Sequence, residues 1–432
     1  MPAAWGARPR SAYVRSVFEP GSGHGRTSAW VWTEAGVGDD AGTAASRGDP
    51  GRGASASGTG LKRRRRRRRL GIAGIVVVAL AGGAVGVGWA VYAKLSGNIT
   101  SDEAAAAELA RYEKERPTSL VRGAQNVLLI GSDSRAGDGN ARYGRDSGTE
   151  RSDTTILLHL AAGRDSVTAV SLPRDLMVRV PGCHRPDGSR TEPALQQFNY
   201  AFAAGGSACS IRTVEKLTGI RVDHHVVVDF AGFKEMVDAL DGVEVCLRKP
   251  VDDKDAKLKL PAGRVTLDGE QALGYVRARK SLGDGSDTDR MDRQQRFLGA
   301  LVNKVQSNDV LLNPVKLYPV LDAATSSLTT DPDLANLRGL YDLVRGLRGI
   351  PTERVQFLTV PRESYAADAN RDQLVQPDAE KLFTRLRTDE PVTIAASRQD
   401  STGGTTHSGE PRDADSPAPT FSGNTADENI CE

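Results

Sequence analysis

Short apolar runs separated by polar turns predict three neighbouring strands in the central part of the chain. Residues 127–130 form an apolar run typical of a buried strand, and residues 154–160 and 166–172 are rich in β-branched and aliphatic side chains. Charged residues stand at the ends of these strands, namely Asp133, Arg151, Asp153, Arg174 and Asp175. Because α/β proteins commonly bind ligands at strand ends, we predict a site there.

The residue types at these strand ends limit what the site can hold. Carboxylate oxygens are ligands for a divalent cation, and the guanidinium of arginine pairs with phosphate through two parallel hydrogen bonds. Two carboxylates among several guanidinium groups therefore suit a polyanion that carries a divalent metal.

Helical and strand-like periods alternate through the rest of the central region. The pattern predicts helices over residues 196–204, 207–218 and 230–240, and strands over residues 222–228 and 243–247. Gly205-Gly206 separates the first two helices. Strands alternating with helices predict an α/β fold in which helices sandwich a mixed central sheet.

The helix predicted over residues 230–240 has an apolar face with two interpretations. Its side chains can line a pocket for a lipid tail, or they can simply pack in the core. The residues concerned are Phe230, Phe233, Met236, Val237 and Leu240.

An uncharged stretch over residues 70–93 predicts one transmembrane helix. That helix would be about 36 Å long, which exceeds the roughly 30 Å hydrocarbon core of a bilayer. Lys62 and the arginines at 63–69 precede it, so the positive-inside rule places the N-terminus in the cytoplasm and everything after Lys94 outside the cell. The arginine run can instead indicate nucleic-acid binding, but positive charge is required here for topology, and we expect no nucleic-acid partner.

Composition divides the chain further. Residues 1–69 are predicted to be a disordered cytoplasmic arm, and residues 94–119 a stalk in which Thr100 and Glu103 resemble a capping box that opens a helix to Arg116. The extracellular domain is expected over residues 120–388, followed by a disordered tail over residues 389–432. A net charge of +2 excludes little, because the basic residues are unevenly spread.

All four cysteines follow the predicted anchor, which agrees with export to an oxidising compartment. Cys183, Cys209, Cys246 and Cys431 lack metal-ligand spacing. The pairing stays open; we favour Cys183 with Cys209, which would join the loop after the third strand to the next helix.

Residues 269–301 hold a second set of polar candidates. Arg277 and Arg279 point the same way only in an extended chain, so a shared site requires the helix over residues 271–275 to end before Arg277. Otherwise the two arginines form a solvated surface pair.

A further helix is expected to begin after the polar loop at residues 281–286. Asp287 and Asp289 are typical of a first helical turn. Arg290 and Gln294 are four residues apart and share one face of that helix. The same helix would pack on the core through Phe297, Leu298 and Leu301.

Other polar residues have structural interpretations. Asp175 can serve only to orient Arg174, as carboxylates behind a binding residue often do. His159, His224 and His225 have no partner at ligand spacing, so we predict structural roles for them.

Several motifs follow one another in a fixed order: Gly131-Ser132-Asp133-Ser134-Arg135, Arg151-Ser152-Asp153-Thr154, Ser171-Leu172-Pro173-Arg174-Asp175, Phe198-Asn199-Tyr200-Ala201 with Gly205-Gly206, Asp229-Phe230 with Gly232-Phe233, Val276-Arg277-Ala278-Arg279, and Arg290 with Arg293-Gln294-Gln295. This order, over roughly residues 126–302, resembles the LytR-CpsA-Psr family. Two departures occur: Asp241 stands where the family usually has Gly, and the insert at 136–150 is long.

The resemblance implies a phosphotransferase that moves a glycopolymer from a polyprenyl-pyrophosphate carrier onto a muramic-acid hydroxyl of peptidoglycan, with Mg²⁺ as cofactor. By motif, Asp133 and Asp153 would hold the metal and form the catalytic set with Arg151 and Arg174. The pyrophosphate would be bound by those two arginines together with Arg277, Arg279, Arg290 and Gln294.

Three other functions stay open. Water in place of the sugar hydroxyl would make the protein a lipid-pyrophosphate hydrolase. The arginine run would suit a regulatory nucleic-acid-binding membrane protein, and an inactive site would leave a wall-binding module. No Ser-His-Asp arrangement or catalytic Cys motif supports a covalent route.

Overall fold

The computed structural model describes residues 59–132, 152–185, 187–254, 256–278, 287–307, 313–396 and 420–428. Of the predicted residues, Asp133, Arg151, Arg279 and Cys431 lie outside these segments. The chain divides into two units, Met1–Ile72 and Ala73–Glu432, and all elements below from β1 onward belong to the second.

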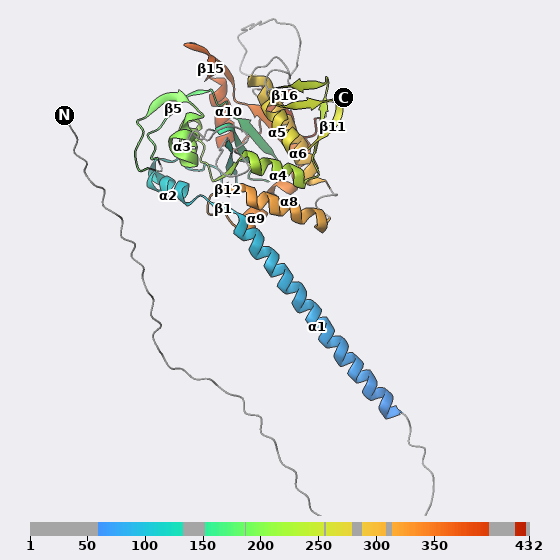
Figure 1. Cartoon of the computed structure of the whole chain (residues 1–432). Helices are drawn as coiled ribbons and strands as arrows, with labels where there is room; N and C mark the ends of the chain where they lie inside the picture. Colours follow the sequence, from blue (N-terminus) through green and yellow to red (C-terminus); the bar gives the residue numbers. More distant parts are fainter. Residues whose placement is uncertain are drawn as a thin grey trace, which may run out of the picture. The chain divides into compact units, whose positions relative to one another are not determined.

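A nine-stranded mixed sheet organises the second unit (Figure 1). In spatial order its strands are β1 (Thr100–Ser101), β12 (Leu328–Thr330), β7 (His224–Val228), β2 (Gln125–Ser132), β3 (Ser152–Leu160), β4 (Val167–Ser171), β13 (Val355–Thr359), β17 (Thr420–Thr425) and β16 (Thr393–Ala396). Strand β2 pairs parallel with β7 and antiparallel with β3. The predicted mixed central sheet is confirmed.

Helices cover both faces of this sheet. Alternate residues of each strand point to opposite faces, so each face packs against its own set of helices. Leu128 and Ile130 of β2 face a first core shared with α2 (Glu103–Arg111), α3 (Tyr200–Thr218) and α10 (Asp378–Arg387). Val127 and Leu129 face a second core shared with α6 (Asp287–Gln306) and α9 (Leu337–Arg348). The predicted helical sandwich is therefore confirmed.

A third core lies beyond the sheet, against α6. It joins α4 (Phe230–Ala239), α5 (Gly269–Arg277) and the pairs β8 (Val243–Leu247) with β11 (Gly263–Leu267) and β9 (Val251–Asp253) with β10 (Leu258–Leu260). Asp241, just after α4, has φ 57°, in the left-handed region that favours glycine, the residue that the family resemblance leads us to expect at this position. The remaining elements are β5 (Met177–Val180) with β6 (Ala194–Gln197), β14 (Arg362–Tyr365) with β15 (Asp368–Leu374), α8 (Pro314–Ser327), η1 (Glu113–Glu115) and η3 (Thr352–Arg354).

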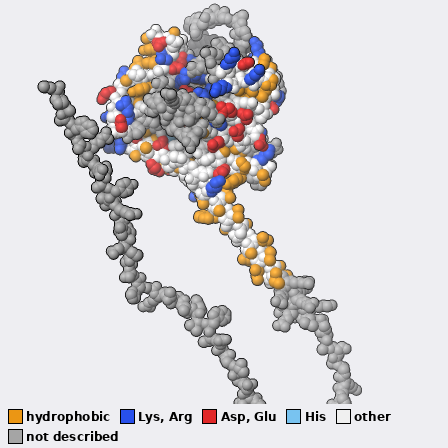
Figure 2. Space-filling view, in the orientation of Figure 1, with side chains coloured by type: hydrophobic (Ala, Val, Ile, Leu, Met, Phe, Trp, Pro, Cys, Tyr) orange, Lys and Arg blue, Asp and Glu red, His pale blue; other side chains and the backbone are white. Residues whose placement is uncertain are grey.

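Helix α1 (Thr59–Asn98) contains the one stretch among the described residues that is long and apolar enough to cross a membrane. This stretch, Leu70–Asn98, has 29 residues and a mean hydropathy of 2.4, and hydrophobic side chains are visible along it (Figure 2). At its end, Lys94 Nζ lies 2.9 Å from Asp322 Oδ2 of α8, and Asn98 Nδ2 donates to Asp322 Oδ1 at 2.8 Å. These bonds fix the last turns of α1 against α8.

Two predicted segment limits are wrong. The stalk is part of the fold, because Thr100 and Ser101 pair with Thr329 and Thr330, and α2 contributes buried side chains to the first core. The predicted tail contains β16 and β17, which pair with each other and extend the sheet through β13. Short strands of this kind depend on distant partners, which local composition does not reveal.

Three local predictions also differ from the structure. Asp102, not Thr100, caps α2, since its carboxylate accepts from Ala105 N at 3.0 Å, and α2 ends at Arg111 rather than at 116. Residues 196 and 197 lie in β6, so the helix begins only at Tyr200, although it is kinked at Gly205-Gly206 as predicted. Helix α5 runs from Gly269 to Arg277, beyond the helix predicted over residues 271–275, so the extended backbone required for a site shared by Arg277 and Arg279 is not found at Arg277.

Candidate functional site

The strand ends predicted to carry the site converge at one edge of the sheet. Strands β2 and β7 are parallel, so both end there, and Gly131 is paired with Val228. Strand β3 is antiparallel to β2 and therefore begins at the same edge, where Ser132 is paired with Ser152. Strand β4 runs antiparallel to β3 and delivers the segment that carries Arg174 to this edge.

A cavity of about 370 Å³ opens at this edge and gathers the predicted site residues of the described chain. Its wall includes Asp153 from β3, Arg174 after β4, Arg277 from α5, and Arg290 with Gln294 from α6. Residues from sequence-distant motifs therefore line a single space. The structure places five of the eight predicted site residues together, and the other three lie outside the described segments.

Arg174 is held in place by two carboxylates. Its Nη1 donates to Asp153 Oδ1 at 2.9 Å and its Nε donates to Asp175 Oδ2 at 3.3 Å. Asp175 in turn accepts from Gln197 Nε2 at 2.5 Å. This arrangement agrees with the interpretation that Asp175 orients Arg174, while Asp153 stands in the cavity wall.

Helices α5 and α6 bring further cations to the cavity. Arg290 lies on the inner face of α6 and is only 5% exposed. Gln294, one turn later, donates through Nε2 to the backbone oxygen of Val276 at 3.2 Å, which joins α6 to the end of α5. The guanidinium carbon of Arg277 lies 4.6 Å from the centroid of the Phe230 ring, within cation–π distance.

Much of the lining of this cavity is apolar. Phe230, Phe233 and Met236 of α4 line it, as one of the two interpretations of that face predicted. Val237 and Leu240 are instead buried in the protein interior, at 1% and 4% exposure. Further apolar lining comes from Leu129, Ile156, Val228, Leu298 and Leu301. The cavity thus combines cationic and hydrophobic side chains in one wall.

The three histidines make structural contacts with acidic or amide side chains. His159 bonds Asn126 at 2.8 Å and Asp389 at 2.9 Å, and its burial lowers its pKa below the ordinary value. His224 lies 3.1 Å from Asp331, and His225 lies 3.2 Å from Asp102. Within the described segments, no group of three or more His, Cys, Asp or Glu side chains is arranged to hold a metal ion.

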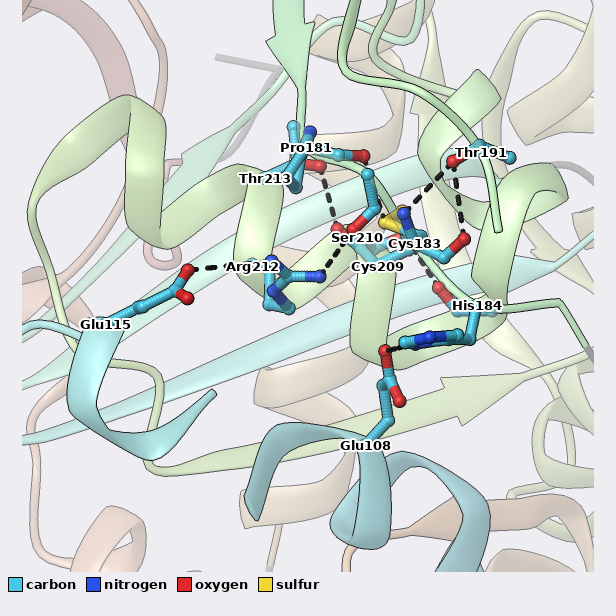
Figure 3. Close-up of a disulfide and its surroundings, with 12 residues drawn as sticks. Glu108, Glu115, Pro181, Cys183, His184, Thr191, Cys209, Ser210, Arg212 and Thr213 are labelled. Carbon is cyan, nitrogen blue, oxygen red and sulfur yellow. Dashed lines mark hydrogen bonds and ion pairs between the residues drawn. A yellow bond between two sulfur atoms is a disulfide. The ribbon is translucent and has the colours of Figure 1, made fainter. Parts of the chain in front are cut away.

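The predicted disulfide is confirmed. Cys183 and Cys209 are bonded, which joins the loop after β5 to α3 (Figure 3). Cys246 is also disulfide-bonded, whereas Cys431 lies outside the described residues.

Sequence reasoning missed two residues of the site. Ser132 and Asp229 stand at the ends of β2 and β7 and line the cavity beside Asp153. Asp229 also caps α4, since its Oδ1 accepts from Gly232 N at 2.8 Å. The sequence did contain a signal for Asp229, because an aspartate that follows an apolar strand and opens a helix must lie where the strand ends, at the sheet edge.

Comparison with known proteins agrees with this architecture. Residues 92–388 match the sequence model of the LytR_cpsA_psr family. A probable cell wall biosynthesis protein, LcpB of Corynebacterium glutamicum, is 36% identical over 272 residues, which is 61% of each chain. The polyisoprenyl-teichoic acid–peptidoglycan teichoic acid transferase TagT of Bacillus subtilis is 30% identical over 259 residues, covering 55% of this chain and 74% of that one.

The chain matches only part of the length of some relatives. Its similarity to solved structures concerns the fold. The cell wall biosynthesis protein LcpA of Corynebacterium glutamicum is 36% identical, but the match spans only 50% of its length. Protein gbs0355 of Streptococcus agalactiae has a crystal structure that superposes with a TM-score of 0.51 at 19% identity, covering 63% of this chain and 91% of that chain.

Proposed function

The chain belongs to the LytR-CpsA-Psr family, and from this premise we propose that it is a membrane-anchored phosphotransferase. In this proposal it moves a glycopolymer from a polyprenyl-pyrophosphate carrier onto a hydroxyl of peptidoglycan and forms a phosphodiester. The names of its relatives support both substrates, since several of them, TagT among them, are polyisoprenyl-teichoic acid–peptidoglycan teichoic acid transferases.

One observation carries the proposal: cationic and apolar side chains line one cavity. Arg174, Arg277 and Arg290 line the same space as Phe233, Met236 and Leu301. A ligand that satisfies both parts must have an anionic head and a hydrophobic tail. A prenyl pyrophosphate has this construction, because its diphosphate suits guanidinium donors and its hydrocarbon gains about 0.8 kcal/mol per buried CH₂.

Mg²⁺ fits the described part of the site. This ion is usually held by one or two protein carboxylates together with substrate phosphates, not by an all-protein cage. Asp153 lies in the cavity wall, and we propose that it and Asp133 hold the metal. Bound there, the ion would withdraw charge from the phosphate oxygens.

The side chains of the site then act on charge and position. Attack by the acceptor oxygen forms a new P–O bond at the sugar-linked phosphorus and breaks the P–O bond to the prenyl phosphate. The leaving phosphate gains negative charge, and Arg174, Arg277 and Arg290 would stabilise it through hydrogen bonds that strengthen as the bond breaks. The acceptor's proton passes to a carboxylate of the site, for which Asp153 is the described candidate.

The proposed location follows from α1. Leu70–Asn98 can cross a bilayer, and the basic run before it favours a cytoplasmic N-terminus. The site would then face the exterior, where peptidoglycan is found. A reporter fused to the C-terminus is expected to be active only outside the cytoplasm. Activity of the reporter in the cytoplasm would show that the chain has the opposite orientation.

A transfer assay tests the function. The purified full chain is incubated in detergent with Mg²⁺, a synthetic prenyl-pyrophosphate saccharide and soluble peptidoglycan fragments, and the products are identified by mass spectrometry. We expect a saccharide joined to peptidoglycan through phosphate, and no such product with Asp153→Ala. If the saccharide is recovered only as unattached saccharide phosphate although acceptor is present, the protein is a hydrolase instead.

A further inference from the structure

A second cavity borders the same sheet edge. Its volume is about 790 Å³, and it shares Ser132 and Asp229 with the first cavity. Its walls come from α2, the kink of α3, the start of α4 and the junction of α8 with β12. Ligands in the two cavities would therefore meet at the ends of β2 and β7.

Both cavities border both cores of the sheet at this edge. Phe202, in the wall of the second cavity, belongs to the first core, whereas Leu328 in the same wall packs against the second core. Ile156, in the wall of the first cavity, belongs to the second core, whereas Ile130 in the same wall belongs to the first core. The two spaces thus adjoin at the sheet edge through the two residues that they share.

The lining of the second cavity is more acidic and more polar than that of the first. Its charged side chains are four carboxylates, two arginines and a histidine, namely Asp102, Glu108, Asp229, Glu235, Arg111, Arg185 and His184, and several serine and threonine hydroxyls stand beside them. Burial alone would raise the pKa of Glu108, but His184 and Arg111 lower it below the ordinary value, so this carboxylate is ionised at neutral pH. Such groups accept hydrogen bonds from hydroxyl, amide and ammonium donors and repel a polyanion.

One wall of this cavity is fixed by the disulfide. Cys183 precedes His184, whose Nδ1 lies 2.7 Å from Glu108 Oε1 of α2, and Cys209 lies in α3 (Figure 3). A Cβ on Gly205 would lie 2.9 Å from the Cβ of Cys183, so the kink of α3 and this loop are in close contact. The wall is therefore preorganised for a ligand instead of forming around it.

We infer that the second cavity binds the acceptor, a peptidoglycan glycan strand whose hydroxyls and peptide amines meet its carboxylates. This inference rests on the proposed function. The acidic and hydroxyl-rich lining of the second cavity suits a polar acceptor better than a prenyl diphosphate, and the largely apolar lining of the first cavity would leave the acceptor's hydroxyls without partners. The acceptor hydroxyl then reaches the reacting phosphorus at Ser132 and Asp229, where both spaces end.

Exposed alanines on α2 allow a test that leaves the fold intact. Ala104 and Ala107 are exposed and line the second cavity, whereas Ala110 is exposed on the same helix outside the cavity wall. In the full chain, Ala107→Trp and Ala104→Trp should each raise the KM for soluble peptidoglycan fragments roughly tenfold or more by filling the cavity. The Kd for a prenyl-pyrophosphate saccharide should not change, and Ala110→Trp should match the unmodified chain in both measurements.

A binding measurement separates this inference from the proposed reaction. Fluorescently labelled peptidoglycan fragments are titrated with the full chain in the absence of donor. Weaker binding by Ala107→Trp and Ala104→Trp, but not by Ala110→Trp, supports the acceptor site even if no transfer product is ever detected. Equal binding by all three variants and the unmodified chain, or no binding by that chain, overturns it.

Discussion

The two cavities at the sheet edge differ in size, polarity and charge. The first holds about 370 Å³ and is lined mainly by apolar side chains and three arginines. The second holds about 790 Å³ and is lined by four carboxylates, several hydroxyls, two arginines and a histidine. Both include Ser132 and Asp229. Under the proposed function, this difference in lining would direct the two unlike substrates to one reacting centre. The first three changes below should each affect one cavity and spare the other, and the fourth should affect neither.

The largest expected effect follows from removing the guanidinium held by Asp153. Arg174→Ala should lower the transfer rate by about 10²–10³-fold, because one preorganised donor to developing charge is lost. Arg179→Ala, at an exposed position of β5, is the matched control and should be nearly neutral. Single-turnover kinetics with saturating acceptor measure this loss; an unchanged rate in Arg174→Ala would remove this arginine from the site.

Removal of the disulfide should affect the second cavity. The bond closes a loop with a sequence separation of 26, so Cys183→Ser with Cys209→Ser should lower the free energy of unfolding by roughly 3 kcal/mol. Because the bond fixes His184 beside Glu108, the KM for acceptor should rise while the Kd for donor stays the same. Denaturant unfolding and both titrations measure this; a change in donor Kd alone would contradict the separation of the cavities.

A polar residue in the apolar interior should affect only the first cavity. Met236→Asn places an amide where a prenyl chain is expected, and the Kd for prenyl-pyrophosphate saccharide should rise by about tenfold, which corresponds to about 1.4 kcal/mol. The Kd for a short-chain soluble analogue should change little. If long and short donors weaken equally, the tail does not occupy this cavity.

The smallest effect should come from a pair remote from both cavities. Burial alone would lower the pKa of His224, but Asp331, Asp223 and Asp333 raise it above the ordinary 6.5. Its charged form is thus favoured in the folded state, and the stability it adds is complete below about pH 6.5 and is lost as pH rises through the raised value.

His224→Gln should accordingly cost about 1 kcal/mol near pH 6 and less above the raised pKa. Denaturant midpoints measured at several pH values check this. Donor Kd and acceptor KM are expected to match those of the unmodified chain, since His224 lies at the opposite end of β7 from Asp229. A pH-independent loss would mean that packing, and not the charge, explains the effect.

Much of the fold and of the first cavity could be predicted from local patterns. Asp153 lies in one strand and Arg174 follows another; both strands are apolar runs bounded by charge, and Arg290 with Gln294 follow helical spacing. Their convergence follows from strand direction, since β2 and β7 are parallel and β3 is antiparallel to β2.

Other features depend on contacts that no local pattern contains. Strands β16 and β17 lie in a polar, low-complexity region and become strands only through pairing with each other and with β13. The second cavity is built in part from small residues such as Ala104, Ala107 and Gly205, which have no recognisable motif. Arg277 reaches the first cavity from the last turn of α5 and not from an extended segment. The two-residue spacing of Arg277 and Arg279 therefore did not reveal the backbone conformation at Arg277.

The most direct measurement is a crystal structure of the full chain with a non-hydrolysable prenyl-pyrophosphate saccharide. The account predicts the diphosphate within hydrogen-bonding distance of Arg174, Arg277 and Arg290, with the prenyl chain between Phe233 and Leu301. A diphosphate bound elsewhere, or a prenyl chain outside the apolar cavity, would contradict it.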